Sequence, residues 1–238
     1  MKQPLRKIFA LSASALLLAS LSACGGSDDD DDDAPPASVP RGATLDLAIL
    51  ATTDLHANVL GYDYYKLAED KSYGVDRTAT LIGNARKQHA NTLLFDNGDT
   101  IQGTALSDYQ ALVAPVQCSD MLAIYKQMKL LAYDAATLGN HEFNYGLPYL
   151  SQVTNVDFGL PGIGKGTAQT NPTGAKDCAA PGFPFVSANV VAAATQQPIF
   201  KPWTLLTRTF KATGPDGKAL DVALKVGVIG FAPPPIMQ

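Results

Sequence analysis

The chain has 238 residues, of which 46% are hydrophobic, and a formal net charge of −4 from 18 basic and 22 acidic side chains. This length and composition suffice for one globular domain with a buried core. The basic residues form no stripe, so the sequence argues against binding to a nucleic-acid duplex through its phosphate backbone.

The first residues have the pattern of an export signal. Three basic side chains precede an apolar run from residue 8 to residue 21, shorter than the roughly 20 residues of a resident membrane helix and typical of a signal peptide. The sequence LSAC, which ends at Cys24, resembles a bacterial lipobox, although a chance cysteine after an ordinary signal peptide is the alternative. We therefore expect residues 1–23 to be a signal peptide and Cys24 to carry a lipid. The mature protein would be periplasmic and anchored to a bacterial membrane.

Residues 24–42 are predicted to be a tether between the lipid and the folded part. The six consecutive aspartates Asp28 to Asp33 repel one another, and the prolines that follow block helix formation, so a disordered, extended linker is expected. Cleavage before Cys24 would leave 15 basic and 22 acidic residues, a net charge of −7. The aspartate run accounts for six of these charges, so the domain over residues 43–238 is expected to be close to neutral.

Strand and helix patterns alternate along residues 43–238. Strands are predicted for residues 45–52, 92–95 and 135–138, and helices for residues 77–88 and 119–131. Later strands are predicted for residues 185–190 and 224–229, with a hairpin near residues 203–210. This alternation indicates parallel β-α-β units, in which the loops after the strand carboxyl ends share one edge of the sheet.

A polar cluster follows each of the first three predicted strands. Asp54 and His56 follow the first strand, Asp99 follows the second, and Asn140 and His141 follow the third. At any single position a helix cap or a turn residue is the simpler interpretation. Three such clusters in order, each after a strand, favour a shared site at the edge of the sheet.

The residue types in these clusters suit two divalent cations. Carboxylate and imidazole ligands together bind Zn, Mn, Fe or Co. Asp99 has two oxygens and can bridge two cations, and Asn140 offers a neutral carbonyl oxygen to the second cation. Two cations roughly 3.5–4 Å apart can clamp the attacking and leaving oxygens of an in-line displacement. His141 is the candidate to stabilise phosphoryl oxygens or to protonate the leaving alkoxide.

With their neighbours, these clusters resemble a known family. The motifs Asp54-x-His56, Gly98-Asp99 and Gly139-Asn140-His141-Glu142 are similar to those of the calcineurin-like metallophosphoesterases. The flanking segments 51–65, 96–103, 139–150 and 226–238 resemble the branch of bacterial 2′,3′-cyclic-nucleotide 2′-phosphodiesterase/3′-nucleotidases.

The resemblance implies an α/β fold, the αββα metallophosphoesterase sandwich. It implies that Asp54, His56, Asp99 and Asn140 are metal ligands, with Asp99 bridging, and that His141 is catalytic. The expected activity is hydrolysis of 2′,3′-cyclic nucleotides and 3′-nucleotides by a monomeric enzyme that uses two divalent metal ions. The alternatives are a related 5′-nucleotidase or other phosphomonoesterase, and an inactive lipoprotein that binds metal or nucleotide.

The sequence departs from the family pattern in two respects. Related 5′-nucleotidases have an acid three positions after the catalytic histidine, where this chain has Asn144, which leaves Glu142 as a weak candidate to orient the ring. The family also uses histidines from later motifs, whereas this chain has only His56, His89 and His141, and His89 is expected at the surface. We therefore interpret the chain as an N-terminal portion of the fold, truncated at its carboxyl end, that binds metal weakly by itself.

Two further cysteines, Cys118 and Cys178, would enter an oxidising compartment on export. A disulfide between them and a pair of free thiols are both compatible with the sequence.

Overall fold

The structure is a computed structural model, and it describes residues 39–234. The expected signal peptide, the lipid-bearing Cys24 and most of the predicted linker lie outside the described residues. No helix within the described range is long and apolar enough to cross a membrane.

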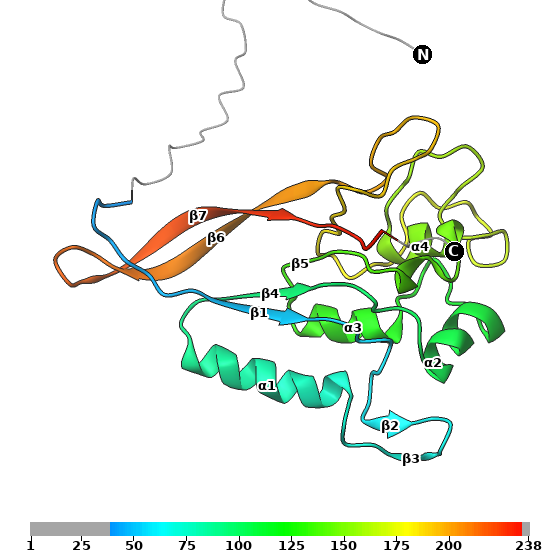
Figure 1. Cartoon of the computed structure of the whole chain (residues 1–238), viewed down its shortest axis with the longest axis horizontal. Helices are drawn as coiled ribbons and strands as arrows, with labels where there is room; N and C mark the ends of the chain where they lie inside the picture. Colours follow the sequence, from blue (N-terminus) through cyan, green and yellow to red (C-terminus); the bar gives the residue numbers. More distant parts are fainter. Residues whose placement is uncertain (1–38, 235–238) are drawn as a thin grey trace, which may run out of the picture. The chain divides into compact units, whose positions relative to one another are not determined.

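A parallel three-stranded sheet forms the centre of the fold. Its order is β1 (Ala48–Thr52), β4 (Thr92–Asp96) and β5 (Ala135–Ala136), so β4 lies in the middle. β1 and β4 run in register, which brings their last residues, Thr52 and Asp96, opposite each other at one edge (Figure 1). The parallel arrangement predicted from the alternating pattern is confirmed, although β5 is shorter than the predicted strand over residues 135–138.

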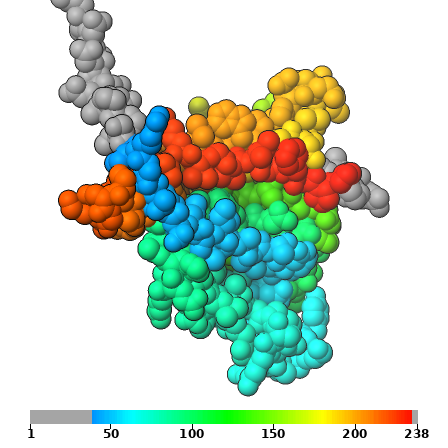
Figure 2. All heavy atoms as spheres, turned by 60° about the vertical axis from the view of Figure 1, so that its left-hand side comes forward, coloured from blue at the N-terminus to red at the C-terminus, as the bar shows by residue number. Residues whose placement is uncertain are grey.

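Helices cover one face of this sheet, and a long hairpin covers the other. Leu94 of β4 packs in a core with residues of α1 (Val75–Gln88) and α3 (Ala123–Leu130). Leu93 of the same strand packs instead with Phe210 and Val222 of the hairpin, because successive side chains of a strand point to opposite faces. Figure 2 shows the hairpin in orange and red above the blue of β1.

The hairpin consists of β6 (Trp203–Thr213) and β7 (Ala219–Ile229), which pair in antiparallel fashion over their whole length. The predicted hairpin near residues 203–210 and the predicted strand over residues 224–229 are both confirmed, and both strands are longer than predicted. The shorter elements are β2 (Tyr62–Asp63), β3 (Ala68–Glu69), α2 (Ala105–Asp108), η1 (Tyr109–Val113), η2 (His141–Phe143) and α4 (Leu147–Thr154).

The strand predicted for residues 185–190 is wrong. Phe185 and Val186 make only isolated bridges, because the backbone donors of this segment go to different parts of the chain. The amide of Val186 donates to Ala136, and the next two amides donate to Lys201 and Gly230. A continuous ladder with one partner strand cannot form under these conditions.

The helix predicted for residues 119–131 begins later than expected. It starts at Ala123, after a turn in which the amide of Asp120 donates to the carbonyl of Gln117 over 2.8 Å. The Asp120 carboxylate also accepts a hydrogen bond from the amide of Met121 over 2.8 Å. Such local side-chain bonds compete with the helical pattern and delay its start.

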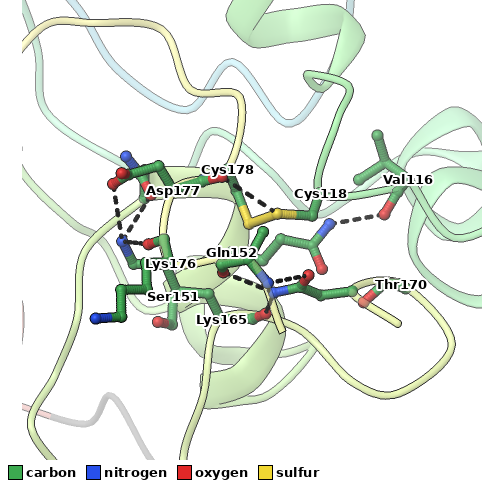
Figure 3. The surroundings of a disulfide bond; sticks show 12 residues. Val116, Cys118, Ser151, Gln152, Lys165, Thr170, Lys176, Asp177 and Cys178 are labelled. Carbon is green, nitrogen blue, oxygen red and sulfur yellow. Dashed lines mark hydrogen bonds and ion pairs between the residues drawn. A yellow bond between two sulfur atoms is a disulfide. The ribbon is translucent and has the colours of Figure 1, made fainter. Parts of the chain in front are cut away.

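Cys118 and Cys178 form a disulfide that joins two segments 60 residues apart. It links the residues before α3 to the long loop of residues 155–180. Close by, Gln152 of α4 donates to the carbonyl of Val116 over 2.7 Å (Figure 3). The amide of Cys118 donates to the carbonyl of Thr170, and the amide of Ala179 donates to the carbonyl of Cys118, each over 2.8 Å. The disulfide and these two bonds hold the long loop against the segment before α3.

Removal of the disulfide should destabilise the fold. A cross-link that closes a loop of this length restricts the unfolded chain and contributes about 2–4 kcal/mol to the free energy of unfolding. We expect a loss of that size for the Cys118→Ser/Cys178→Ser variant in urea unfolding. A reducing agent should move the wild-type curve toward that of the variant and leave the variant curve in place. Equal midpoints for the oxidised and reduced wild type would contradict this expectation.

Candidate metal centre

Three of the predicted ligands converge at the carboxyl edge of the parallel sheet. Asp54, His56 and Asp99 each offer one ligating atom, and these atoms all lie within 4.8 Å of one another. The Nε2 atom of His56 is 3.6 Å from the Oδ1 atom of Asp54. Two carboxylates and an imidazole at this separation form a group that could hold a divalent cation.

Left-handed backbone brings these side chains together. β1 ends at Thr52, so strand alternation does not extend to Asp54 and His56. Instead Asp54, His56 and Asp99 have φ angles of +55°, +45° and +56°. Non-glycine residues in this region cost about 1–3 kcal/mol each and are typical of functional sites, where surrounding contacts hold them.

Backbone hydrogen bonds between the first two loops hold that conformation. The amide of Asp54 donates to the carbonyl of Gly98 over 3.0 Å, and the amide of His56 donates to the carbonyl of Asp99 over 2.9 Å. The amide of Ala57 donates to the next carbonyl along, that of Thr100, over 2.7 Å. The loops after β1 and β4 therefore stay paired beyond the ends of the strands.

The ring of His56 is held in one orientation. Its Nδ1 atom lies 2.7 Å from the carbonyl oxygen of Gln102. Because a carbonyl can only accept, Nδ1 carries the proton and Nε2 is left with a lone pair for a cation. Gly103 has a φ angle of +136°, and a Cβ there would lie 2.7 Å from His56 Nδ1, so this close approach requires glycine.

The loops that follow β4 and β5 approach each other at two glycines. A Cβ on Gly98 would overlap the backbone of Gly139, and a Cβ on Gly139 would overlap the carboxylate of Asp99. Across this contact the amide of His141 donates to Asp99 Oδ1 over 2.8 Å. The glycines before Asp99 and before Asn140 are therefore needed to place Asp99 beside the third loop.

Glu142 is buried beneath the site, with 1% of its surface exposed. Its carboxylate accepts hydrogen bonds from the amides of Asp99 over 2.8 Å, Thr100 over 2.6 Å and Gly139 over 2.6 Å. Burial raises the pKa of Glu142, and the backbone donors partly offset that rise. The carboxylate thus joins two loops and does not orient His141, contrary to the interpretation of the sequence.

Asp96, at the end of β4, is a second buried acid that the sequence analysis missed. It accepts hydrogen bonds from the hydroxyls of Thr52 and Thr100, each over 2.6 Å, and thereby connects β1 to the loop after β4. Burial raises the pKa of Asp96 above its ordinary value. An acid at the last position of a strand that is otherwise apolar was the signal that could have identified it.

His141 lies beside the cluster, and its ring centroid is 5.1 Å from that of His56. The Oδ1 atom of Asn144 is 3.0 Å from His141 Nδ1, so a neutral amide fills the position where an acid was expected to orient the ring. Asn140 is half-buried and directly precedes His141 at the start of η2. His89 is exposed at the end of α1 and precedes the amino end of β4, whereas the cluster follows the carboxyl end of that strand.

The amino-acid sequence is similar to those of a known family and of several of its members. The family model for the calcineurin-like phosphoesterases matches residues 47–189. A 2′,3′-cyclic-nucleotide 2′-phosphodiesterase/3′-nucleotidase of Yersinia enterocolitica is 40% identical over 200 residues, which cover 84% of this chain and 26% of the relative. A protein of the same description from Haemophilus influenzae is 38% identical over 193 residues, which cover 81% of this chain and 25% of the relative. This chain spans about a quarter of the length of these curated relatives.

A solved structure is also similar. The crystal structure of the calcineurin-like phosphoesterase YfkN from Bacillus subtilis matches with a TM-score of 0.64 at 38% sequence identity. The match covers 81% of this chain and 50% of that chain.

Glu142→Gln tests the role of the buried carboxylate. The amide group of glutamine would face backbone donors, and each buried N–H left without an acceptor costs about 1–3 kcal/mol. We expect a loss of at least that size in the free energy of unfolding, together with weaker Mn²⁺ binding. The control is Glu69→Gln on β3, where the glutamate is exposed. Equal unfolding midpoints and equal Mn²⁺ affinities for the two variants would contradict the proposed role.

Proposed function

Because the chain belongs to the calcineurin-like phosphoesterase family, we propose that it supplies the metal-binding part of an enzyme that hydrolyses phosphate esters of nucleotides. The names of the relatives from Yersinia and Haemophilus favour 2′,3′-cyclic nucleotides and 3′-nucleotides as substrates. The observation that carries the proposal is the convergence of Asp54, His56 and Asp99 within 4.8 Å.

The proposed ligands divide between two cations. Asp54, His56 and Asp99 would bind the first cation, and Asp99 and Asn140 would bind the second, with Asp99 shared. The donor set suits Zn, Mn, Fe or Co. When bound, the two cations would polarise the phosphoryl group and activate the water that attacks it. Among residues 39–234, the proposed second site has one shared carboxylate and one amide, so we expect this cation to bind more weakly.

The role that we propose for His141 follows from its hydrogen bonds. The Asn144 amide engages Nδ1, which leaves Nε2 as the ring nitrogen that can meet the substrate. In the protonated ring, Nε2 can donate to a phosphoryl oxygen or give its proton to the leaving alkoxide. Asn144 is neutral, so it orients the imidazole without adding a negative charge beside it.

Asp99→Asn tests the shared ligand. The substitution removes the charge that both cations would share, so Mn²⁺ titration followed by electron paramagnetic resonance should show weaker binding at both sites. In the complete enzyme, hydrolysis of 2′,3′-cyclic AMP and 3′-AMP should fall about a thousandfold, which corresponds to roughly 4 kcal/mol of transition-state stabilisation. The matched control is Asp46→Asn, a change at an exposed position before β1. Wild-type Mn²⁺ binding and turnover in Asp99→Asn would rule out the two-cation proposal.

We also propose that Cys24 carries a lipid that anchors the exported protein to a bacterial membrane. The support is the LSAC sequence after a short apolar run, followed by an acidic, proline-containing linker. Acyl chains add about 0.8 kcal/mol of membrane affinity per buried methylene, so several chains hold a protein firmly.

Cys24→Ser tests the anchor directly. We expect the variant to incorporate no labelled fatty acid and to leave the membrane fraction when cells are fractionated. Cys118 and Cys178 remain in this variant, so labelling that persists at the wild-type level would refute attachment at Cys24.

A further inference from the structure

We infer that Asp108 is a positioning residue for His141, and that it acts through Tyr145 and Asn144. The Oδ1 atom of Asn144 lies 3.0 Å from His141 Nδ1, and Tyr145 directly follows Asn144 in the chain. The hydroxyl of Tyr145 donates to Asp108 Oδ1 over 2.6 Å. The carboxylate thus holds the neighbour of the residue that orients the histidine ring. This inference rests on the proposed function only for the catalytic role of His141.

Asp108 is held in place by a capped turn of helix. It is the last residue of α2, and its amide donates to the carbonyl of Thr104 over 3.1 Å. The side chain of Thr104 accepts a hydrogen bond from the amide of Ser107 over 3.3 Å, which caps the helix. Just before α2, the carbonyl of Gln102 fixes the ring of His56 over 2.7 Å. The segment 102–108 therefore supports His56 directly and is placed to support the second histidine of the site through Asp108.

Tyr145 is held at both its ring and its hydroxyl. It lies half-buried between η2 and α4, at the end of the molecule toward which β1 and β4 point (Figure 1). Its ring meets that of Tyr149 edge to face, with centroids 5.3 Å apart. Burial and the hydrogen bond to Asp108 raise the pKa of the Tyr145 hydroxyl, so this group stays protonated and remains a donor. Two contacts thus fix Tyr145 and, with it, the backbone of Asn144.

Asn144 needs this support because its own bond to the histidine is easily lost. Its side chain is exposed, so water competes for the contact with His141. A neutral amide also attracts an imidazole less strongly than a carboxylate does. The position of the Asn144 backbone therefore decides how often its Oδ1 atom meets His141 Nδ1. Tyr145 and Asp108 restrain that backbone, and this restraint is the contribution that we assign to Asp108.

The tautomer of the His141 ring is the direct measure of this restraint. Long-range ¹H–¹⁵N NMR on the 238-residue chain in EDTA shows which ring nitrogen carries the proton at a pH of about 8.5, well above the ordinary histidine pKa of about 6.5. Because the Oδ1 atom of Asn144 can only accept, wild-type His141 should carry its proton on Nδ1. Tyr145→Phe and Asp108→Ala should each lower the Nδ1–H to Nε2–H ratio of His141 by about 2- to 10-fold, the equivalent of one lost hydrogen bond. The ratio of His56 should stay unchanged and is the internal reference.

Two further variants separate positioning from stability alone. Asp108→Asn keeps an oxygen that can accept from Tyr145 and should restore most of the wild-type ratio. Tyr149→Phe is the matched control, because the buried hydroxyl of Tyr149 makes no hydrogen bond to any described residue. Thermal unfolding followed by circular dichroism would establish that each variant folds.

The inference is overturned if the His141 ratio in Tyr145→Phe stays at the wild-type value, even where the melting temperature falls. It is also overturned if Asp108→Asn matches Asp108→Ala, or if Tyr149→Phe changes the ratio as much as Tyr145→Phe does. Neither metal nor substrate is present in this measurement, so its result is separate from that of the Asp99→Asn experiment.

Discussion

The close approach of the loops after β4 and β5 is the contact on which the candidate metal centre depends. Gly98 lies against the backbone of Gly139, and Gly139 lies against Asp99, so neither glycine has room for a Cβ. The Glu142 carboxylate accepts hydrogen bonds from backbone amides of the loop after β4 and of the loop after β5, and so fixes the distance between these loops. A buried carboxylate is costly without hydrogen-bond partners, and here backbone donors supply them. One buried acid therefore sets the distance between Asp99 and the loop that carries His141.

The loop after β1 joins this unit through its backbone. The amides of Asp54 and His56 donate to carbonyls of the β4 loop, which extends the pairing of the strands past their ends. These bonds stabilise the left-handed conformations that Asp54 and His56 adopt. Asp96 adds a side-chain link between the same two segments through Thr52. Three loops from distant parts of the sequence thus behave as one rigid support, as expected of a site that must hold ligands in place before a cation binds.

The sequence predicted which of the proposed ligands lie together, because the carboxyl ends of neighbouring parallel strands meet at the same edge of a sheet. Apolar runs marked β1, β4 and β5, and polar residues after each run marked one edge, which was enough to select Asp54, His56 and Asp99. The contacts of Glu142 were not predictable in this way, because they depend on where backbone amides some 40 residues away point after folding. The same limit explains residues 185–190, where the apolar pattern was right for a strand but the donors had three separate partners.

The segment from Asp54 to Val75 connects the charged cluster at the sheet edge to the start of α1. At its beginning, Asp54 and His56 belong to the charged cluster at the sheet edge. A few residues later, Tyr62 and Tyr64 line a cavity that His56 also borders. Because Asn58 and Gly61, which lie between His56 and the β2–β3 hairpin, are hydrogen-bonded to the first residues of α1, side chains on that hairpin can change without moving the backbone that holds Asp54 and His56. This arrangement separates the backbone that bears the proposed ligands from the tyrosine side of the cavity, so substitutions of these tyrosines are expected to leave the ligand-bearing loops as they are.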